Sequence, residues 1–443
     1  MTEPASGSPR NGAGHAGVAA RFAALGLIEA VVARGLSLDE AVDQSGALVK
    51  LEARDRAFAH ALAAASVRSW GFLLAVVDRC LDRPGGHLPD RLRGVLALGA
   101  AQLLILKVPP HAAVGATVEL VDGKLERLKG LANAVLRRLD REAATIAAGL
   151  DPGLLSTPDW LYAGWREAYG AATASAIAAA HQQEPPLDLS LKPDLDKAAW
   201  AERLGAAVLP TGSLRLREHG RVMDLPGYAE GAWWVQDAAA ALPARLLGDV
   251  RGARVIDLCA APGGKTAQLA AAGAEVTAVD QARGRMDRLA ENLARLGLSA
   301  ETVVADVATW RPAERAPFVL LDAPCSATGT LRRNPDIVLH KGQEDTRALS
   351  RIQGKLLRAA IDMLAPGGTL VFCTCSLEPR EGPAVIEMAL GAGAPLRRKP
   401  IQPAEVPGLE GAINAAGDLR TLPSLWPESG GLDGFFASRL VRV

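Results

Sequence analysis

Apolar side chains recur every three or four positions through residues 18–145, which is the period of one buried helix face. Ser37 with Glu40 three residues later forms a capping box, which predicts that a helix begins there. The stretch from Arg91 to Lys107 is apolar nearly all round and is expected to be a buried central helix. The spacing predicts helices over Arg21–Ala33, Ala53–Trp70, Gly71–Leu81, Arg91–Lys107, His111–Val121 and Leu131–Arg141. We therefore expect residues 18–145 to form an all-helical bundle.

The helical pattern gives way to short elements between residues 146 and 245, where prolines recur. Leu187–Leu191 alternates apolar and polar positions like a strand, and Asp196 is an N-cap candidate for a helix over Lys197–Leu204. A hairpin over 207–216 and an Ala/Leu-rich helix over Ala238–Leu247 complete a small α+β connecting module. Gln236 and Asp237 either cap that last helix or face a ligand.

Strands and helices alternate from Arg251 onward, so residues 246–443 are predicted to be an α/β domain with a parallel sheet covered on both faces. The predicted strands are Val255–Leu258, Val276–Val279, Thr302–Ala305, Phe318–Leu321 and Leu370–Thr374. The predicted helices are Thr266–Ala272, Gly284–Leu296, Gln343–Leu364 and Glu381–Leu390. Such sheets bind ligands at the carboxyl ends of their strands. Asp280, Asp306, Asp322 and Cys375 stand at or just beyond these ends.

The stretch VIDLCAAPGGKT, residues 255–266, is a buried strand followed by a glycine turn and a helix. Its end, Gly264-Lys265-Thr266, matches a P-loop, but the first glycine of that pattern falls on Cys259. The dinucleotide pattern G-x-G-x-x-G is absent. An S-adenosylmethionine loop needs small residues after the first strand and an acid at the end of the second, which Asp280 supplies. The pattern therefore favours this third interpretation over an ordinary βα turn.

The amino-acid composition limits which binding partners and which cellular compartment we expect. The 443 residues are 49% hydrophobic and 22% charged, which is typical of a globular chain of two or three domains. Lysine plus arginine and aspartate plus glutamate each number 49, so any basic surface is local. Basic residues do gather late in the helical segment, where they form either a solvated face or a phosphate-binding patch. These residues are Lys124, Arg127, Lys129, Arg137, Arg138 and Arg141.

Five cysteines without an apolar leader indicate free thiols in a reducing compartment, the cytoplasm. Residues 1–17 are expected to be a disordered tail, and no apolar run is long enough to cross a bilayer. Asp322-Ala323-Pro324-Cys325 and Cys373-Thr374-Cys375 each end a strand. The Cys-x-Cys spacing fits zinc poorly, and no metal site is expected. Nucleophilic catalysis fits best, with Cys80 and Cys373 as structural residues and Cys259 shaping the loop.

Residues 252–443 closely resemble the RNA cytosine-5 methyltransferases, of the bacterial 16S ribosomal RNA type known as RsmB or Sun. The motifs that carry the resemblance are DLCAAPGGKT, AVDQARGRMDRLAENLARLG, LLDAPCSATGTLRRNPDI, GGTLVFCTCSLEPREG and DGFFASRL. The segments VPPHAAVGATVEL and LKGLANAVLRRL resemble the NusB-type RNA-binding domain of this subfamily. Leu189-Ser190-Leu191-Lys192-Pro193 departs from the LRVN-like pattern of the family, which affects the connecting module and not the chemistry.

The resemblance implies roles for individual residues. Cys375 is the nucleophile that adds to cytosine C6, Cys325 assists release of the product, and Asp322 lies between cofactor and base. Asp280 contacts the ribose and Asp306 the adenine side of S-adenosylmethionine. The residues lining this cofactor are Cys259, Ala260, Ala261, Pro262, Gly263, Gly264 and Lys265. Arg332 and Arg333 either hold RNA phosphates or are exposed loop charges.

The expected activity is methyl transfer from S-adenosylmethionine to C5 of a cytosine in 16S ribosomal RNA, by a monomer. The same chemistry on transfer RNA is one alternative. A non-catalytic NusB-like antitermination factor, which binds RNA without transferring a methyl group, is the other. The paired cysteines and the cofactor loop argue against that last alternative.

Overall fold

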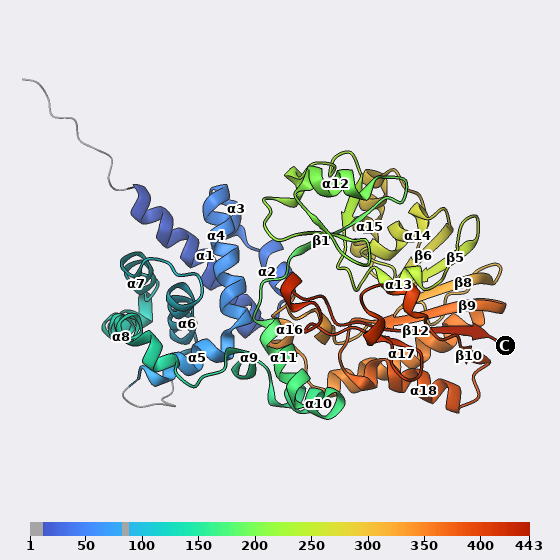
Figure 1. Cartoon of the computed structure of the whole chain (residues 1–443). Coiled ribbons are helices and arrows are strands. Elements are labelled where there is room, and N and C mark those ends of the chain that lie inside the picture. The colour runs from blue at the N-terminus through green and yellow to red at the C-terminus, as the bar shows by residue number, and fades with distance from the viewer. Residues whose placement is uncertain (1–11, 82–87) are drawn as a thin grey trace, which may run out of the picture. The chain divides into compact units, whose positions relative to one another are not determined.

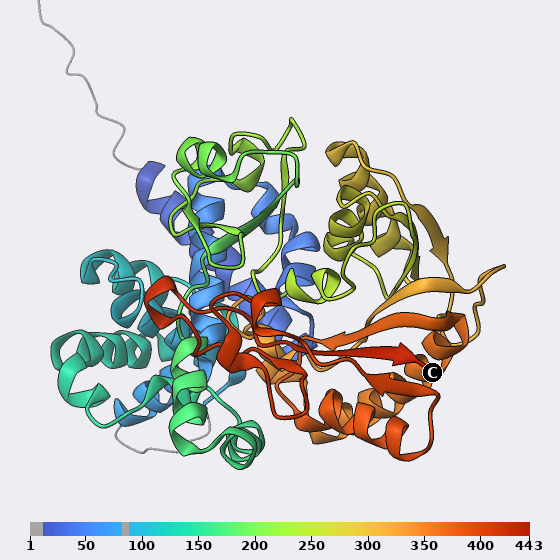
Figure 2. The same ribbon diagram turned by 45° about the vertical axis from the view of Figure 1, so that its right-hand side comes forward.

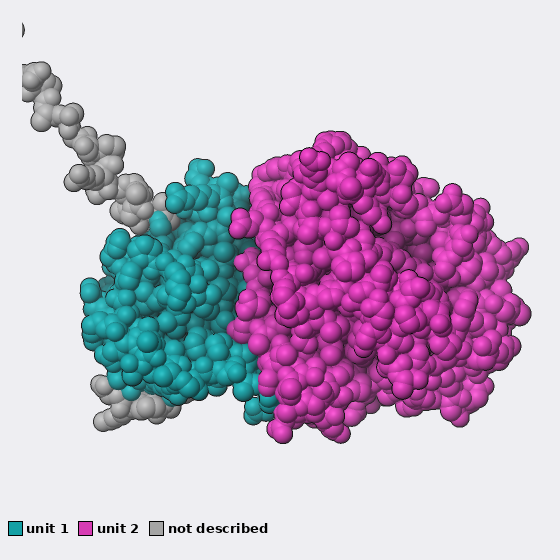
Figure 3. Space-filling model, in the orientation of Figure 1, with its two compact units in different colours: residues 1–162, 334–340 teal, residues 163–333, 341–443 magenta. Residues whose placement is uncertain are grey.

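The computed structural model describes residues 12–81 and 88–443. The chain forms two compact units (Figure 3): Met1–Tyr162 with Asn334–His340, and Ala163–Arg333 with Lys341–Val443. From residue 163 onward, the segment that we expected to be a connecting module therefore belongs to the same compact unit as the α/β sheet.

The helices follow the sequence pattern through most of the chain (Figure 1). They are α1 Gly12–Arg34, α2 Leu38–Asp43, α3 Gly46–Val49, α4 Ala53–Arg68, α5 Trp70–Arg79, α6 Asp90–Leu104, α7 Pro110–Val118, α8 Lys129–Ala147, α9 Pro152–Leu155, α10 Asp159–Tyr169, α11 Ala171–His181, α12 Lys197–Leu204, α13 Leu242–Arg245, α14 Gly264–Ala271, α15 Arg283–Leu296, α16 Ile337–His340, α17 Gln343–Met363 and α18 Pro383–Gly391. The sequence analysis did not predict α10 and α11.

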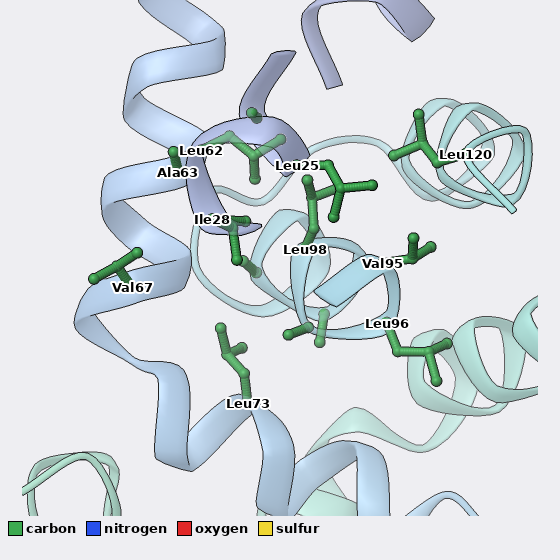
Figure 4. Close-up of a cluster of buried hydrophobic side chains, with 14 of the residues drawn as sticks. Leu25, Ile28, Leu62, Ala63, Val67, Leu73, Val95, Leu96, Leu98 and Leu120 are labelled. Atoms are coloured by element: carbon green, nitrogen blue, oxygen red, sulfur yellow. The ribbon is translucent and has the colours of Figure 1, made fainter. Parts of the chain in front are cut away.

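The core of the first unit is a helical bundle around α6. Buried residues of α1, α4, α5 and α6 meet in one apolar cluster, with Leu25, Leu62, Leu73 and Leu96 among its members (Figure 4). Most residues of α6 are buried, which confirms the predicted central helix. The capping box at the start of α2 is also present, with Ser37 N donating to the Glu40 carboxylate at 2.9 Å. Leu339 of α16 packs against this cluster, and His340 Nε2 lies 2.9 Å from Val31 O.

Helix α1 begins at Gly12, so residues 12–17 are helical and not part of the disordered tail that we expected. Extending an existing helix costs far less than nucleating one, which lets the Ala- and Gly-rich segment join α1. Residues 1–11 of the expected tail lie outside the described residues. In the described part of the chain, no single helix meets the length and hydropathy criteria for a membrane span. The consecutive helices α4 and α5 meet them only as a pair, bent by 78°.

The second unit contains a sheet of eight strands. Its main path runs β10-β12-β9-β8-β5-β6-β7, and β11 pairs with β12. The strands are β5 Arg254–Leu258, β6 Glu275–Asp280, β7 Glu301–Val304, β8 Ala316–Asp322, β9 Leu364–Thr374, β10 Leu396–Arg398, β11 Leu419–Arg420 and β12 Phe436–Arg442. The five strands from β9 to β7 are parallel, as predicted. Three further strands, β10, β11 and β12, were not predicted, and they pair antiparallel at one edge of the sheet.

Helices cover both faces of this sheet, with α14 and α15 on one face and α17 and α18 on the other (Figures 1 and 2). Along β9, Leu370 and Phe372 belong to the apolar cluster that contains residues of α17 and α18. Val371 and Cys373 belong to the cluster on the opposite face. This alternation is the period of two that a strand buried on both faces requires. The carboxyl ends of β5, β6, β8 and β9 consequently meet at one edge.

A second, four-stranded sheet precedes the large one, in the order β2-β3-β1-β4. Its strands are β1 Leu187–Leu191, β2 Ala207–Val208, β3 Leu214–Leu216 and β4 Trp233–Val235. The predicted hairpin is present, and Asp196 caps α12 by accepting from Ala198 N at 2.8 Å. The predicted helix over Ala238–Leu247 is wrong in extent, since only α13 is helical. Proline at position 243 has no N–H for a helical bond to a preceding carbonyl, so no regular helix extends back to Ala238.

Candidate active site

The loop between β5 and α14 has two residues with positive φ, Cys259 at 59° and Gly263 at 103°. Gly263 caps α14 in a conformation that favours glycine. A Cβ there would also lie 2.7 Å from the Leu289 side chain. The loop therefore turns sharply at the end of β5 and directs the first backbone N–H groups of α14 outward. Cys259 is largely enclosed in this turn, where burial raises the pKa of its thiol.

A cavity of about 420 Å³ lies against this loop. The sequence analysis assigned part of its lining to the cofactor, namely Ala260, Pro262–Lys265 and Asp322. Tyr228, Trp234 and Arg295 also line it, and the sequence analysis missed them because they come from the loop before β4, from β4 and from α15. Gln236 lines the cavity, which agrees with the second of its two possible roles, that of facing a ligand. Its Nε2 donates to Gln268 Oε1 at 3.3 Å.

Asp280 ends β6 beside the loop and is buried. Its Oδ2 accepts from Ala261 N at 3.3 Å, and its Oδ1 accepts from Ala282 N at 2.9 Å. Arg285 Nη2, near the start of α15, lies 3.0 Å from Asp280 Oδ1, a pairing that was not predicted from the sequence. Asp306 is exposed just beyond β7, where its Oδ1 accepts from Ala308 N at 2.9 Å. These contacts place Asp280 against the loop, and they give Asp306 a local turn-forming role.

Asp322 ends β8 with one partner on each carboxylate oxygen. Lys265 Nζ donates to its Oδ2 at 2.6 Å, and Cys373 Sγ donates to its Oδ1 at 3.3 Å. Burial alone lowers the pKa of Lys265, but Asp322 and the sulfurs of Cys373 and Cys375 outweigh burial and raise it. The lysine therefore keeps its charge close to the two strand-end cysteines. Cys373, expected to be only structural, also holds the carboxylate in place.

The two expected catalytic cysteines meet at this edge of the sheet. Cys325 Sγ lies 3.4 Å from Cys375 Sγ, and both thiols are free and half-buried. The hydrogen bond with Cys375, together with burial, raises the pKa of Cys325. A thiol that stays protonated beside a second thiol is suited to exchanging a proton with it. Cys80 lies elsewhere, in the apolar core of the first unit, which agrees with its expected structural role.

Asp257 is buried in the middle of β5, and we therefore expect the stability of the fold to depend on pH. Burial raises its pKa to about 7, and Thr266 Oγ1 donates to its Oδ2 at 2.6 Å. Between its unfolded pKa and about pH 7 the folded protein binds this proton more tightly than the unfolded chain, so stability falls as pH rises. The Asp257→Asn variant has no carboxyl group at this position, so its stability should not show this fall with rising pH. We expect its unfolding free energy to gain about 2–4 kcal/mol relative to the wild type between pH 4 and pH 8.

Chemical denaturation at several pH values measures this difference. The same change at exposed Asp287 is the control and should give a difference that does not vary with pH. A constant difference for Asp257→Asn as well would contradict the assignment of the buried proton.

The structure contradicts the prediction that Arg332 and Arg333 hold RNA phosphates. The side chain of Arg332 is fully buried, and its Nη2 lies 3.0 Å from Asp433 Oδ1. Arg333 Nη2 lies 2.7 Å from Asp237 Oδ2. Asp237 also accepts from Ala239 N at 2.8 Å, so it caps the turn before α13 and does not face a ligand. Each arginine therefore forms an ion pair with a buried carboxylate within the fold, as a buried charge requires.

The basic residues late in the helical bundle differ in their surroundings. Lys124 and Arg127, in the 3₁₀ helix Gly123–Leu128, are exposed, as is Arg137 of α8. Lys129 lies 3.7 Å from both Glu119 and Glu126, whereas Arg138 pairs with Glu142 at 3.2 Å. That this face binds RNA stays a prediction. Its exposed residues, Lys124, Arg127 and Arg137, are the best candidates for contacting phosphates. In residues 12–81 and 88–443, no cluster of three or more His, Cys, Asp or Glu side chains is arranged to hold a metal ion.

Comparison with known proteins shows similarity over nearly the whole chain. The model of the family described as 16S rRNA methyltransferase RsmB/F matches residues 244–441, and that of the NusB family matches residues 18–141. Ribosomal RNA small subunit methyltransferase B of Pseudomonas syringae pv. tomato is 36% identical over 446 residues, covering 96% of this chain and 97% of that protein.

Solved structures share the fold at lower identity. The crystal structure of PH0851 has a TM-score of 0.71 at 20% identity and covers 99% of this chain and all of that one. NSun6 from Pyrococcus horikoshii with SFG has a TM-score of 0.56 at 18% identity over 65% of this chain and 98% of that one. These likenesses support a helical NusB-type domain joined to a Rossmann-like methyltransferase domain.

Proposed function

Since this chain belongs to the RsmB/F family of 16S rRNA methyltransferases, we propose that it methylates C5 of a cytosine through a covalent bond from Cys375 Sγ to C6. The chain is an S-adenosylmethionine-dependent rRNA methyltransferase. The finer proposal concerns the atom that is methylated and the intermediate. The observation that carries it is the pair of sulfurs 3.4 Å apart at the ends of β8 and β9, beside the Lys265–Asp322 pair.

The loop residues are suited to hold S-adenosylmethionine. Gly264 faces the 420 Å³ cavity, where a Cβ would take up space now open to a ligand. Asp280, a buried carboxylate beside Ala261 N, is suited to receive ribose hydroxyls. Asp306 is exposed, and we propose that it contacts the adenine side. When bound, the cofactor supplies an electrophilic methyl group. The chain's own residues have to supply everything that makes cytosine C5 able to take it.

Cysteine addition makes C5 nucleophilic. Cytosine C5 by itself is too poor a nucleophile for a sulfonium methyl group, so Cys375 Sγ attacks C6 and forms a carbon–sulfur bond. The proton of the Cys375 thiol ends on ring N3, which leaves an electron-rich enamine at C4–C5. The Asp322 carboxylate, fixed by Lys265 and Cys373, accepts a hydrogen bond from the N3–N4 edge of the ring. C5 then takes the methyl group.

Release reverses the addition. The C5 hydrogen leaves as a proton to a base at or held by Cys325, and the Sγ–C6 bond breaks with its electron pair returning to Cys375. Ring N3 then gives up its proton. The short distance between the two sulfurs supports a role for Cys325 in breaking this bond. A target base enclosed by this edge has to leave its stack, as in other enzymes that act on single bases.

We further propose that the NusB-type domain contributes to binding of the ribosomal RNA and that the protein acts as a monomer in the cytoplasm. The match to the NusB family over residues 18–141 and the exposed basic residues of α8 and the preceding 3₁₀ helix support this role. RNA binding of this kind should weaken steeply as salt concentration rises, because phosphate contacts release counterions.

Methyl transfer from tritiated S-adenosylmethionine to 16S ribosomal RNA tests the proposal. We expect tritium in 5-methylcytosine after nuclease digestion. We also expect a denaturation-resistant complex when the RNA contains 5-fluorocytosine, because fluorine cannot leave C5 as a cation in the way that hydrogen leaves as a proton. Methylation at N4 or at a ribose oxygen, or transfer without a trapped complex, would contradict it. Transfer to transfer RNA but not to 16S ribosomal RNA would favour the alternative substrate.

A further inference from the structure

One buried carboxylate joins the loops of the two cysteines. Glu381, at the end of the 3₁₀ helix Pro379–Glu381, is fully buried. Its Oε1 accepts from Ser326 N at 2.9 Å, and its Oε2 accepts from Ser376 Oγ at 2.6 Å. Ser326 Oγ donates to the same Oε2. Since these serines directly follow Cys325 and Cys375, the carboxylate fixes the residue beside each sulfur.

The two loops depend on this carboxylate to different degrees. Cys375 follows β9, where Thr374 pairs with Phe436 of β12, so the sheet itself holds its backbone. Gly329 N donates to Cys375 O at 2.9 Å and adds a further restraint. Residues 324–327 have no regular structure, and Ala327 has a φ of 57°. Besides Glu381, this loop is held at Pro324 O, which accepts from Gln353 Nε2 at 2.9 Å, and at Ala327 O, which accepts from Thr330 N at 2.9 Å. Ser326 Oγ also lies 3.2 Å from Ser376 Oγ.

We propose that Glu381 is a positioning residue that keeps Cys325 beside Cys375 and thereby controls release of the methylated base. The inference rests on the proposed function and extends it to a side chain that bonds to neither sulfur. Losing the carboxylate frees the Cys325 loop more than the strand end that presents Cys375. Attack on C6 should therefore survive, while the later step that needs Cys325 should slow. Burial raises the pKa of Glu381, but donors from Ser326 and Ser376 favour its charged form.

The Glu381→Gln variant tests this separation of steps. The amide nitrogen of glutamine cannot accept a hydrogen bond, so either the Ser326 N–H or the two serine hydroxyls lose their acceptor. We expect the rate of complex formation with 5-fluorocytosine RNA to stay within about threefold of the wild type. Turnover on unmodified RNA should fall by about tenfold or more. A covalent complex with unmodified RNA, resistant to denaturing gel electrophoresis, should accumulate.

Glu378→Gln is the matched control, because it makes the same change at another buried glutamate three residues earlier. The Glu378 carboxylate accepts from Trp165 Nε1 at 3.2 Å and not from either serine side chain. We expect this variant to release product at the wild-type rate. Should Glu381→Gln fail to fold, Ser326→Ala combined with Ser376→Ala removes the hydroxyl bonds to Glu381 and keeps the Ser326 N–H bond. This double variant also removes the bond from Glu378 N to Ser376 Oγ, which Ser326→Ala alone leaves in place.

Equal slowing of complex formation and turnover, or wild-type release in both Glu381→Gln and the double serine variant, would overturn the inference. Accumulation of the complex in Glu378→Gln to the same extent would also overturn it, since any buried carboxyl in the segment would then suffice. If wild-type protein forms no complex with 5-fluorocytosine RNA, the proposed function fails, and this inference falls with it. If wild-type protein forms the complex, and Glu381→Gln and the double serine variant release product as the wild type does, the proposed function stands and this inference alone fails.

Discussion

Replacing Cys375 by alanine is expected to abolish both methyl transfer and the covalent complex with RNA, whereas replacing Cys325 by alanine is expected to abolish turnover and leave the complex in place. Without the Cys375 sulfur no bond to C6 forms, so C5 never becomes nucleophilic and the rate falls by ~1,000-fold or more. Without the Cys325 sulfur, 3.4 Å away, attack still takes place but release does not.

Both variants are measured against unmodified and 5-fluorocytosine RNA by denaturing electrophoresis and by tritium transfer. The control is Cys80→Ala, which removes a buried thiol from the helical core of the first unit and should keep both activities. The opposite pattern, with a stable complex in Cys375→Ala and none in Cys325→Ala, would assign the attack to the cysteine after Pro324. Loss of the complex in both variants would mean that the thiols act only as a pair.

The cofactor loop and the cysteine edge were predictable because their signals are local. A β-branched run followed by Pro262, Gly263 and Gly264 has few conformations open to it, and parallel strands place their carboxyl ends together. The resemblance to a methyltransferase family then assigned Cys375 and Cys325, and their sulfurs do lie in contact. Capping boxes and N-caps, which involve residues three positions apart, were also predictable for the same reason.

Contacts between distant segments were not predictable. Arg332 and Arg333 resemble exposed loop charges in sequence, but their partners Asp237 and Asp433 lie about a hundred residues away in either direction. Glu381 gave no signal, since it meets Ser326 across 55 residues. The antiparallel strand β12 was missed because its residues were interpreted as a family motif and not as an alternating strand. In each case, one segment acquires its role from another that a periodic pattern does not identify.

Replacing Arg332 by alanine is expected to lower the unfolding free energy of the second unit by about 3–5 kcal/mol, because it leaves two buried carboxylates with Arg333 as their one remaining arginine partner. The guanidinium is fully buried between Asp237, at 3.5 Å, and Asp433, at 3.0 Å. Burial by itself raises the pKa of Asp237, but Arg333 and Arg332 outweigh it and hold that pKa below its usual value. Removing one arginine therefore makes the charged carboxylate costly.

Two further variants separate this cause from simple loss of a side chain. Arg254→Ala removes one partner of an exposed pair with Glu314, whose side chains are 49% and 72% exposed, and should cost below about 1 kcal/mol. Adding Asp433→Asn to Arg332→Ala should recover about 1 kcal/mol or more, because the second change removes one of the two buried carboxylates that then share Arg333. Thermal and denaturant unfolding measure all three.

A double variant less stable than Arg332→Ala would mean that lost packing, and not a carboxylate that has lost a cation, accounts for the cost. Retained RNA affinity in Arg332→Ala at temperatures where it stays folded would agree with the buried position of this arginine, which leaves no guanidinium surface for a phosphate.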